Sequence, residues 1–228
     1  MQKVLLYSGG MDSWLIDKIW HPDVKLYINI GNEYSKYEIV KLDSDVHIYD
    51  MKFLSQLERE DKIIPLRNLY FLSFATNFGE EICLGATNGD RVLDKSLQFG
   101  KQTEDLFNYL YQKQHWTEEK RFKINLEFKS LTKTELLKKY LDQGGNIEEA
   151  FFGSFSCYNP RNKEECWKCK PCFRKWVSFK LNGYQTSKKI IDIVVPYILE
   201  DIYPSILNNT YGRKKEEQEI LKAIKEYI

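Results

Sequence analysis

Two observations predict a doubly wound α/β fold with a parallel sheet for this chain of 228 residues. Short apolar segments typical of strands alternate with segments of helical periodicity through the first two thirds of the sequence. The first apolar segment stops abruptly at Ser8-Gly9-Gly10, and a helix is predicted directly after this turn. A chain of this length buries roughly 70% of its unfolded surface, so it needs no disulfide bonds for stability. Ligands of such sheets bind at the carboxyl ends of the strands.

The predicted elements follow one another in the order that this fold requires. Pro65 is placed to start a helix that carries Leu69 and Leu72 at helical spacing. Thr132 and Glu135 form the pattern of a capping box at the start of a later helix, and the strand before it alternates polar and apolar residues. We predict strands over 4–7, 24–30, 46–49, 82–86 and 123–128, and helices over 14–20, 34–42, 66–78, 103–114 and 132–141.

The turn after the first strand has the composition of a phosphate-binding loop. Glycines allow the backbone to turn tightly and to approach a ligand, and the following helix presents unpaired N–H groups to an anion. The turn lacks the Gly-Lys-Ser/Thr of the common P-loop. A phosphate-binding turn by itself does not need Asp12, and the alternative is that Asp12 only caps the helix and the glycines only form a turn. The predicted nucleotide-binding residues are Tyr7, Ser8, Gly9, Gly10, Met11, Asp12 and Ser13.

Four of the five cysteines have the spacing of metal ligands, C-x8-C-x2-C-x2-C. A structural Zn²⁺ takes four ligands, and a two-residue spacer lets adjacent thiolates turn toward one ion. An iron–sulfur cluster and a reduced, unliganded set are the alternatives. The fifth cysteine, Cys83, lies in an apolar segment and is predicted to be an inert core residue. The predicted metal ligands are Cys157, Cys166, Cys169 and Cys172, with Lys163, Lys168, Lys170 and Arg174 beside them to offset the thiolate charge.

We therefore divide the chain into an α/β domain of residues 1–150 and a segment of residues 151–228 that holds the cysteines and a helical tail. Helical periodicity recurs over 187–197 and 214–228. The aromatic residues of the tail, for which packing onto the domain is favoured over a partner interface, are Tyr184, Tyr197 and Tyr203.

Composition and charge fit a cytoplasmic enzyme and exclude few other classes of protein. The formal net charge of +1 gives no case for wholesale nucleic-acid binding, and lysine and arginine are spread evenly. The dense cluster Arg213-Lys214-Lys215 is followed at once by two glutamates, as on a solvated helix. No signal peptide is recognised, and no run approaches the roughly 20 apolar residues of a membrane span.

Residues 8–13, Ser-Gly-Gly-Met-Asp-Ser, resemble the pyrophosphate loop of ATP pyrophosphatases, with the adenine-nucleotide α-hydrolase-like fold. Together with the four cysteines, this loop makes the chain resemble the 7-cyano-7-deazaguanine synthase family of queuosine biosynthesis. The resemblance covers about residues 1–176. Further segments that match the family in order are Gly31 with Glu38, Pro65-Leu66-Arg67-Asn68, Gly85 to Asp90, Leu131 to Glu135, and Ser156-Cys157-Tyr158.

The chain departs from the family at positions that concern substrate recognition. Asn32-Glu33-Tyr34 stands where the family has Gln-Arg-His, and the segment Val92-Leu93-Asp94-Lys95 is shortened. Trp167 replaces the glycine that usually follows the second cysteine, and the tail beyond Trp176 is longer. The activation chemistry is therefore predicted more firmly than the acceptor.

The resemblance implies an ATP-dependent ligase that uses Mg²⁺, which Asp12 helps to hold in the family's pattern. In this reaction 7-carboxy-7-deazaguanine is adenylated, ammonia forms the amide, and a second activation yields the nitrile. The resemblance also implies a small-molecule substrate and a homodimer. Each middle-region residue has a plainer alternative, as a surface or turn residue. The predicted catalytic residues are Asp12, Arg67 and Lys133, and the predicted substrate-binding residues are Arg67, Asn68, Asp90 and Lys101.

Two other functions are compatible with the sequence. One is another pyrophosphate-loop enzyme that adenylates a different acceptor, such as a tRNA base or a protein carboxylate. The other is a non-catalytic nucleotide-binding or conjugating partner whose acceptor site has changed.

Overall fold

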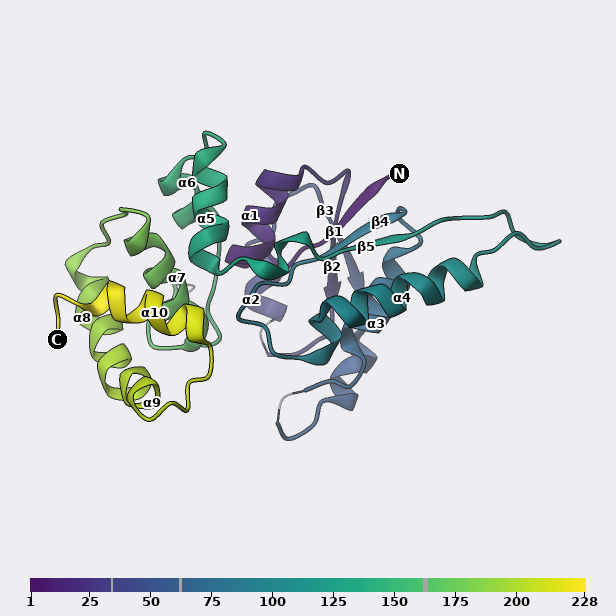
Figure 1. Ribbon diagram of the computed structural model, residues 1–228. Coiled ribbons are helices and arrows are strands. Elements are labelled where there is room, and N and C mark those ends of the chain that lie inside the picture. Colours follow the sequence, from purple (N-terminus) through teal and green to yellow (C-terminus); the bar gives the residue numbers. More distant parts are fainter. Residues whose placement is uncertain (34, 62, 162–163) are drawn as a thin grey trace.

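The computed structural model describes residues 1–33, 35–61, 63–161 and 164–228. Its centre is a five-stranded sheet in the order β3-β2-β1-β4-β5 (Figure 1). Every pair of neighbouring strands is parallel, and Leu5 of β1 lies opposite Lys25 of β2 and Cys83 of β4. The strands are β1 (Lys3–Leu6), β2 (Val24–Asn29), β3 (Val46–Asp50), β4 (Glu81–Leu84) and β5 (Lys123–Asn125).

Helices cover both faces of this sheet, which confirms the predicted doubly wound fold. The chain runs outward from β1 to β3 and then returns to add β4 and β5 on the other side of β1. The order of the strands therefore reverses between β1 and β4, the position where such sheets bind ligands. The helices are α1 (Met11–Trp20), α2 (Ser35–Ile39), α3 (Arg67–Ala75), α4 (Leu97–Leu110), α5 (Lys133–Asp142), α6 (Ile147–Gly153), α7 (Lys170–Leu181), α8 (Lys188–Tyr197), α9 (Tyr203–Leu207) and α10 (Lys214–Ile224).

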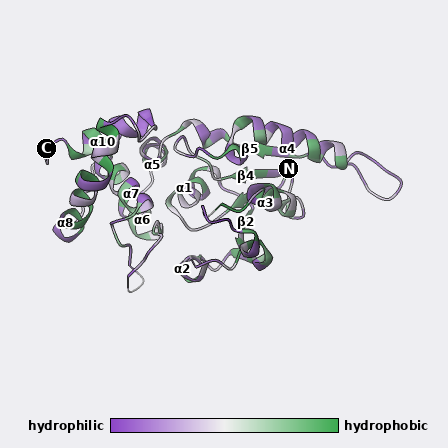
Figure 2. Ribbon diagram, turned by 90° about the horizontal axis from the view of Figure 1, so that it is seen from below, coloured by the Kyte–Doolittle hydropathy of each residue, from purple (hydrophilic) through white to green (hydrophobic). Residues whose placement is uncertain are grey.

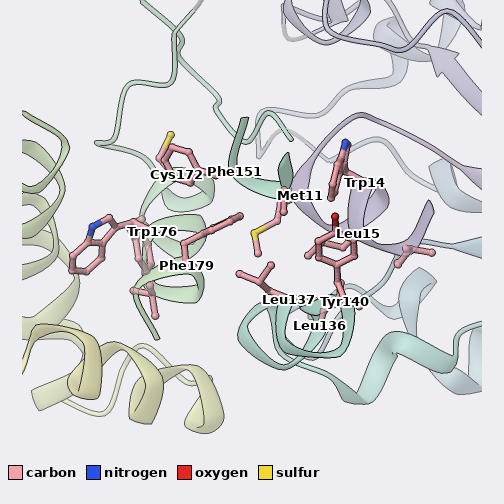
Figure 3. Close-up of a cluster of buried hydrophobic side chains, with 14 of the residues drawn as sticks. Met11, Trp14, Leu15, Leu136, Leu137, Tyr140, Phe151, Cys172, Trp176 and Phe179 are labelled. Carbon is pink, nitrogen blue, oxygen red and sulfur yellow. The ribbon is translucent and has the colours of Figure 1, made fainter. Parts of the chain in front are cut away.

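Alternation along the strands divides the core into two clusters, because successive side chains of a strand point to opposite faces. Val4 and Ile82 face one cluster, which is closed by α3 and α4. Leu5 and the fully buried Cys83 face the other, which confirms the prediction for Cys83. The second cluster extends from α1 through α5 to α7, and Figure 3 shows Met11 among the side chains that fill it. α4 and α10 carry hydrophobic and hydrophilic residues on the same helix, as helices at a core boundary do (Figure 2).

The C-terminal helices pack onto the α/β layer through α1, α5 and α6 (Figure 1). Residue 150, where the sequence suggested a boundary, lies inside α6, and Phe151 and Phe173 belong to the same core cluster as Met11. Tyr184 packs on Phe151 with ring centroids 4.6 Å apart. The tail aromatics Tyr184, Tyr197 and Tyr203 are all partly buried against this cluster.

Several element boundaries differ from the prediction by a few residues, and some of these differences have a local reason. α4 begins at Leu97 rather than at 103, because the Ser96 hydroxyl accepts the Phe99 N–H at 3.0 Å and caps the helix. β5 ends at Asn125 because the side-chain carbonyl of Asn125 accepts the Glu127 N–H at 3.0 Å and turns the chain. α2 is a short helix, and residue 34 of its predicted start lies outside the described residues. Among the described helices, none is long and apolar enough to cross a membrane.

Candidate functional site

The turn after β1 is held open by its own side chains. Gly9 has φ of +70°, a left-handed conformation that favours glycine, and Gly10 is the extended N-cap of α1. The Ser13 hydroxyl accepts the Ser8 N–H at 3.1 Å and donates to the Gly10 carbonyl at 3.1 Å. The Ser8 hydroxyl lies 3.3 Å from that of Ser13. The two serines thereby preorganise the backbone of the turn.

The cysteine segment also shapes this turn. The Phe155 N–H donates to the Gly9 carbonyl at 2.9 Å, and the Ser156 hydroxyl accepts the Met11 N–H at 3.2 Å. The Met11 side chain lies in the hydrophobic core (Figure 3), so it contributes little polar surface to a ligand. Two motifs about 145 residues apart in sequence are therefore parts of one structure.

A cavity of about 500 Å³ opens at the carboxyl ends of β1 and β4. Its position at the reversal of strand order is where a ligand of this fold is expected. It brings together residues that the sequence analysis selected from segments far apart in the chain. These lining residues are Tyr7, Ser8, Gly10, Met11, Asp12, Ser13, Arg67, Asn68, Asp90 and Lys133.

Asp12 and Lys133 form an ion pair in this cavity. Lys133 is the first residue of α5, directly after the N-cap Thr132 and within the capping box that Glu135 completes. Burial lowers the pKa of the Lys133 ammonium, although the Asp12 carboxylate counteracts this effect. The N-cap of α1 is Gly10, and the Asp12 carboxylate contacts Lys133 instead of capping the helix. The arrangement provides one carboxylate and one buried cation beside the Ser-Gly-Gly turn.

Arg67 and Asn68 lie at the start of α3 and line the cavity. The Arg67 guanidinium lies over the Phe71 ring at 6.0 Å. The side-chain nitrogen of Asn68 is buried and finds no hydrogen-bond partner among the described residues. A buried donor without a partner is costly, so this amide is suited to bind a ligand acceptor.

Sequence reasoning gave no role to Glu38, which the structure places in the same cavity as Tyr27 and Arg67. The Tyr27 hydroxyl donates to the Glu38 carboxylate at 2.8 Å. Burial raises the pKa of the Glu38 carboxyl, against the effects of Tyr27 and Arg67. The match of Gly31 and Glu38 to the family was the sequence signal that could have pointed to Glu38 as a site residue.

Asp90 is already engaged within the protein. Its carboxylate accepts the Thr87 N–H at 2.9 Å and lies 3.5 Å from the Lys95 ammonium. Burial by itself raises the pKa of Asp90, but Lys95 and the Thr87 N–H lower it below its usual value. Lys129 donates to the carbonyls of Thr87 and Asp90 at 2.9 and 2.7 Å and fixes the turn. The shortened segment that contains Lys95 therefore still reaches the cavity.

Lys101 does not lie at this site. It is on α4 with 67% of its side chain exposed, and its ammonium contacts Asp105 at 2.8 Å, one helical turn away. Lys101 is not among the described residues that line the cavity. The structure therefore does not bring Lys101 together with the other predicted substrate-binding residues, because α4 presents this position to solvent.

The four thiols of Cys157, Cys166, Cys169 and Cys172 converge, with all sulfur atoms within 4.8 Å of one another. This set fits a tetrahedral metal site of the zinc type. The pKa of the Cys169 thiol is lowered to about 4, mainly because Cys157 and Cys172 donate hydrogen bonds to it. Trp167, which stands where the family has glycine, has φ of +55°, so this position needs the left-handed conformation that glycine adopts easily.

A buried cation that the sequence analysis did not select, Lys175, lies in the segment that carries the cysteines. Lys175 is fully buried and donates to the carbonyls of Phe151 and Ser154 at 2.8 and 2.7 Å and to Glu165 at 3.0 Å. Glu165 also accepts the Ser156 N–H at 2.6 Å. Of the cations predicted beside the thiolates, Lys168 and Lys170 are exposed, Lys163 lies outside the described residues, and Arg174 lines the cavity.

The fold and the site together define a doubly wound α/β protein with a polar cavity at the sheet's switch point and a four-cysteine centre joined to it. The family model described as "Queuosine biosynthesis protein QueC" matches residues 25–183. The chain belongs to this family, of which it is a divergent member.

Several relatives bear the name 7-cyano-7-deazaguanine synthase. The one from Sulfolobus acidocaldarius is 26% identical over 71% of this chain and 33% of its own length. That from Leptospira interrogans is 28% identical over 57% of this chain and 54% of its own length. The 7-cyano-7-deazaguanine synthase 1 of Colwellia psychrerythraea is 22% identical over 79% of this chain and 94% of its own length. The chain thus spans about a third and about half of the first two relatives, and no solved structure matches it.

Proposed function

We propose that this protein is an ATP-dependent ligase that converts 7-carboxy-7-deazaguanine and ammonia to 7-cyano-7-deazaguanine. The observation that carries the activation step is the Asp12–Lys133 pair beside the preorganised Ser-Gly-Gly turn, inside one cavity at the switch point of the sheet. The names of the relatives support the acceptor.

In the proposed reaction the carboxylate oxygen of the acid attacks the α-phosphorus of ATP and displaces pyrophosphate. Ammonia then attacks the acyl carbon, and AMP leaves with the former carboxylate oxygen. A second ATP activates the amide oxygen in the same way, and loss of AMP and two protons leaves the nitrile. These steps need charge neutralisation, alignment and exclusion of water rather than a nucleophilic side chain.

The residues of the cavity fit these needs. The turn of residues 8–13, which Ser8 and Ser13 hold in shape, would receive the phosphates at the N-terminus of α1, and Asp12 would hold Mg²⁺, which neutralises the leaving pyrophosphate. Lys133 would stabilise charge that develops on the phosphate. Arg67 can hold the acid by two parallel hydrogen bonds, and Asn68 has a free donor for the base. The four cysteines would hold a structural Zn²⁺ that fixes the segment bonded to Gly9 and Met11.

A different acceptor is the second candidate. Asp90, which the sequence suggested for the guanine-like edge, is occupied by Thr87 and Lys95, and Lys95 belongs to the segment that departs from the family. An enzyme of the same activation chemistry but with another acid or amide as substrate fits this observation.

One experiment separates these functions. The purified protein is incubated with ATP, Mg²⁺, ammonia and 7-carboxy-7-deazaguanine, and AMP, pyrophosphate and product masses are followed. We expect AMP to form faster with the acid than with ATP alone, and masses of the amide and the nitrile to appear. ATP cleavage that the acid does not stimulate would support another acceptor, and ATP binding without cleavage would support a non-catalytic partner.

A further inference from the structure

Arg174 is a second buried cation beside the Asp12–Lys133 pair. It comes from α7, lines the 500 Å³ cavity, and has only 15% of its side chain exposed. Asp12 attracts its guanidinium, and Lys133 and Arg174 repel each other across the cavity. Two poorly hydrated like charges that line one cavity favour the binding of an anion between them. Asp12 pairs with Lys133.

A residue of the C-terminal tail holds Arg174 in this position. Glu216 of α10 forms an ion pair with Arg174 and has 6% of its side chain exposed. Glu216 is itself held by the Tyr211 hydroxyl at 3.1 Å and by Arg213 at 3.4 Å. The Nε of Arg174 is buried and has no hydrogen-bond partner in the part of the chain that the structure describes. The Nε–H group of Arg174 is thus a hydrogen-bond donor that the ion pair with Glu216 does not use.

The neighbouring turn leaves room for this pair. A Cβ atom on Gly89 would overlap both the guanidinium of Arg174 and the carboxylate of Glu216. The turn that carries Asp90 therefore needs glycine at this position so that Arg174 can pass to the cavity. The residues that position Arg174 lie beyond residue 183, where the family match ends.

We infer that Arg174 is a further phosphate-binding residue of this cavity, and that Glu216 is the positioning residue that directs it there. This inference rests on the proposed function, because it assigns the anion to the polyphosphate of the nucleotide. A guanidinium can hold two phosphate oxygens at once, which a single ammonium such as that of Lys133 does not do. The tail helix α10 is then a part of the site rather than an appendage.

The test is the affinity for inorganic pyrophosphate with Mg²⁺, measured by titration calorimetry. We expect Arg174→Met to weaken binding at least roughly tenfold and Arg174→Lys to weaken it by a smaller factor, because lysine keeps the charge but not the planar pair of donors. The matched control is Lys180→Met, which removes a cation of the same helix that pairs with tail residue Glu226. Among the described residues, Lys180 is not one of those that line the cavity. This variant should therefore bind pyrophosphate like the wild type.

The positioning role is tested by combining substitutions. Glu216→Gln should weaken pyrophosphate binding several-fold in the wild type and leave it unchanged in Arg174→Met, because Glu216 acts through Arg174. An equal effect in both backgrounds, or tighter binding, would overturn the positioning role. Melting temperature and zinc content confirm that each variant is folded. If Arg174→Met does not fold, the pyrophosphate affinity of Arg174→Lys tests the role of Arg174.

The proposed function and the role of Arg174 would be overturned by different results. Wild-type protein that binds neither pyrophosphate nor ATP would overturn the proposed function, and the inference with it. Wild-type protein that binds both, with Arg174→Met and Arg174→Lys binding equally well, would overturn the inference alone.

Discussion

Lys133 reaches across from the first turn of α5 to pair with Asp12, 121 residues earlier in the chain. The pair links the two helices on one side of the cavity, because Asp12 lies in the first turn of α1. Both side chains are mostly buried, with 12% and 22% exposed, so water screens their attraction only in part. The Asp12 carboxylate is therefore suited to bind a second cation such as Mg²⁺. Lys133 is suited to bind the phosphate that accompanies this cation.

The first prediction concerns Asp12. Asp12→Asn keeps an acceptor for Lys133 and removes the charge that would hold Mg²⁺. We expect the variant to fold, with AMP and pyrophosphate release reduced by roughly a hundredfold or more. Lys101→Ala is the control, because Lys101 lies outside the cavity, and it should keep full activity. Normal turnover in Asp12→Asn would show that the turn and its aspartate are only structural.

The second prediction concerns the metal. Elemental analysis of the purified protein should find close to one zinc per chain, bound by the four converging thiolates. Cys169→Ser should give unstable or insoluble protein, since structural zinc contributes folding free energy. Removal of zinc by a chelator should also disturb the phosphate turn, because Ser156 and Phe155 next to the cysteines hold it. Iron with sulfide, or no metal at all, would contradict this prediction.

The third prediction concerns the buried pair of Lys175 and Glu165. Lys175→Met leaves Glu165 without its cation and removes two hydrogen bonds to carbonyls, so we expect a loss of about 3–5 kcal/mol of stability in urea unfolding. Lys168→Met removes an exposed lysine of the same segment and should change stability by less than about 0.5 kcal/mol. Equal stability of the two variants would mean that the packing of the segment does not depend on this pair.

The fold could be predicted from the sequence because its signals are local. Strand periodicity, the Ser-Gly-Gly turn and the capping box of Thr132 each depend on residues a few positions apart, and all appear in the structure. The start of α4 was missed because the capping role of Ser96 was not recognised. The convergence of the four thiols followed from their spacing alone.

The parts of the site that were missed depend on contacts between distant segments. Neither Lys175 nor Glu216 stands in a pattern that sets it apart from a solvated charge. Burial of Lys175 follows from the packing of α6 against α7, and Glu216 meets Arg174 only because α10 packs on α7. Lys101 shows the reverse case, since a lysine selected from the sequence faces solvent once the helix is built.

The fourth prediction concerns Arg67. If the acid of the substrate is held by a guanidinium, Arg67→Lys keeps the charge and loses the planar pair of donors. We expect the half-saturating concentration of 7-carboxy-7-deazaguanine to rise roughly tenfold, with little change for ATP. Initial rates of AMP formation at varied acid and at varied ATP give both values. A change in the ATP value alone would instead place Arg67 at the nucleotide.

The fifth prediction concerns Glu38 and the dependence of stability on pH. Burial raises the pKa of Glu38 above its ordinary value of 4.5, so the folded protein binds this proton more tightly than the unfolded chain. Its contribution to stability is therefore present at pH below 4.5 and is lost as the pH rises through the raised pKa. Glu38→Gln removes this titration and keeps an acceptor for the Tyr27 hydroxyl.

Urea unfolding of Glu38→Gln and the wild type from about pH 4 to about pH 8 measures this effect. We expect the variant to gain stability relative to the wild type as the pH rises, by about 1.4 kcal/mol for each unit by which burial raises the pKa. Glu33→Gln, at an exposed position of the same segment, controls for the change in net charge. A difference between Glu38→Gln and the wild type that stays constant with pH would show that the Glu38 carboxyl titrates alike in the folded and unfolded protein, and that its burial beside Tyr27 and Arg67 is fully compensated.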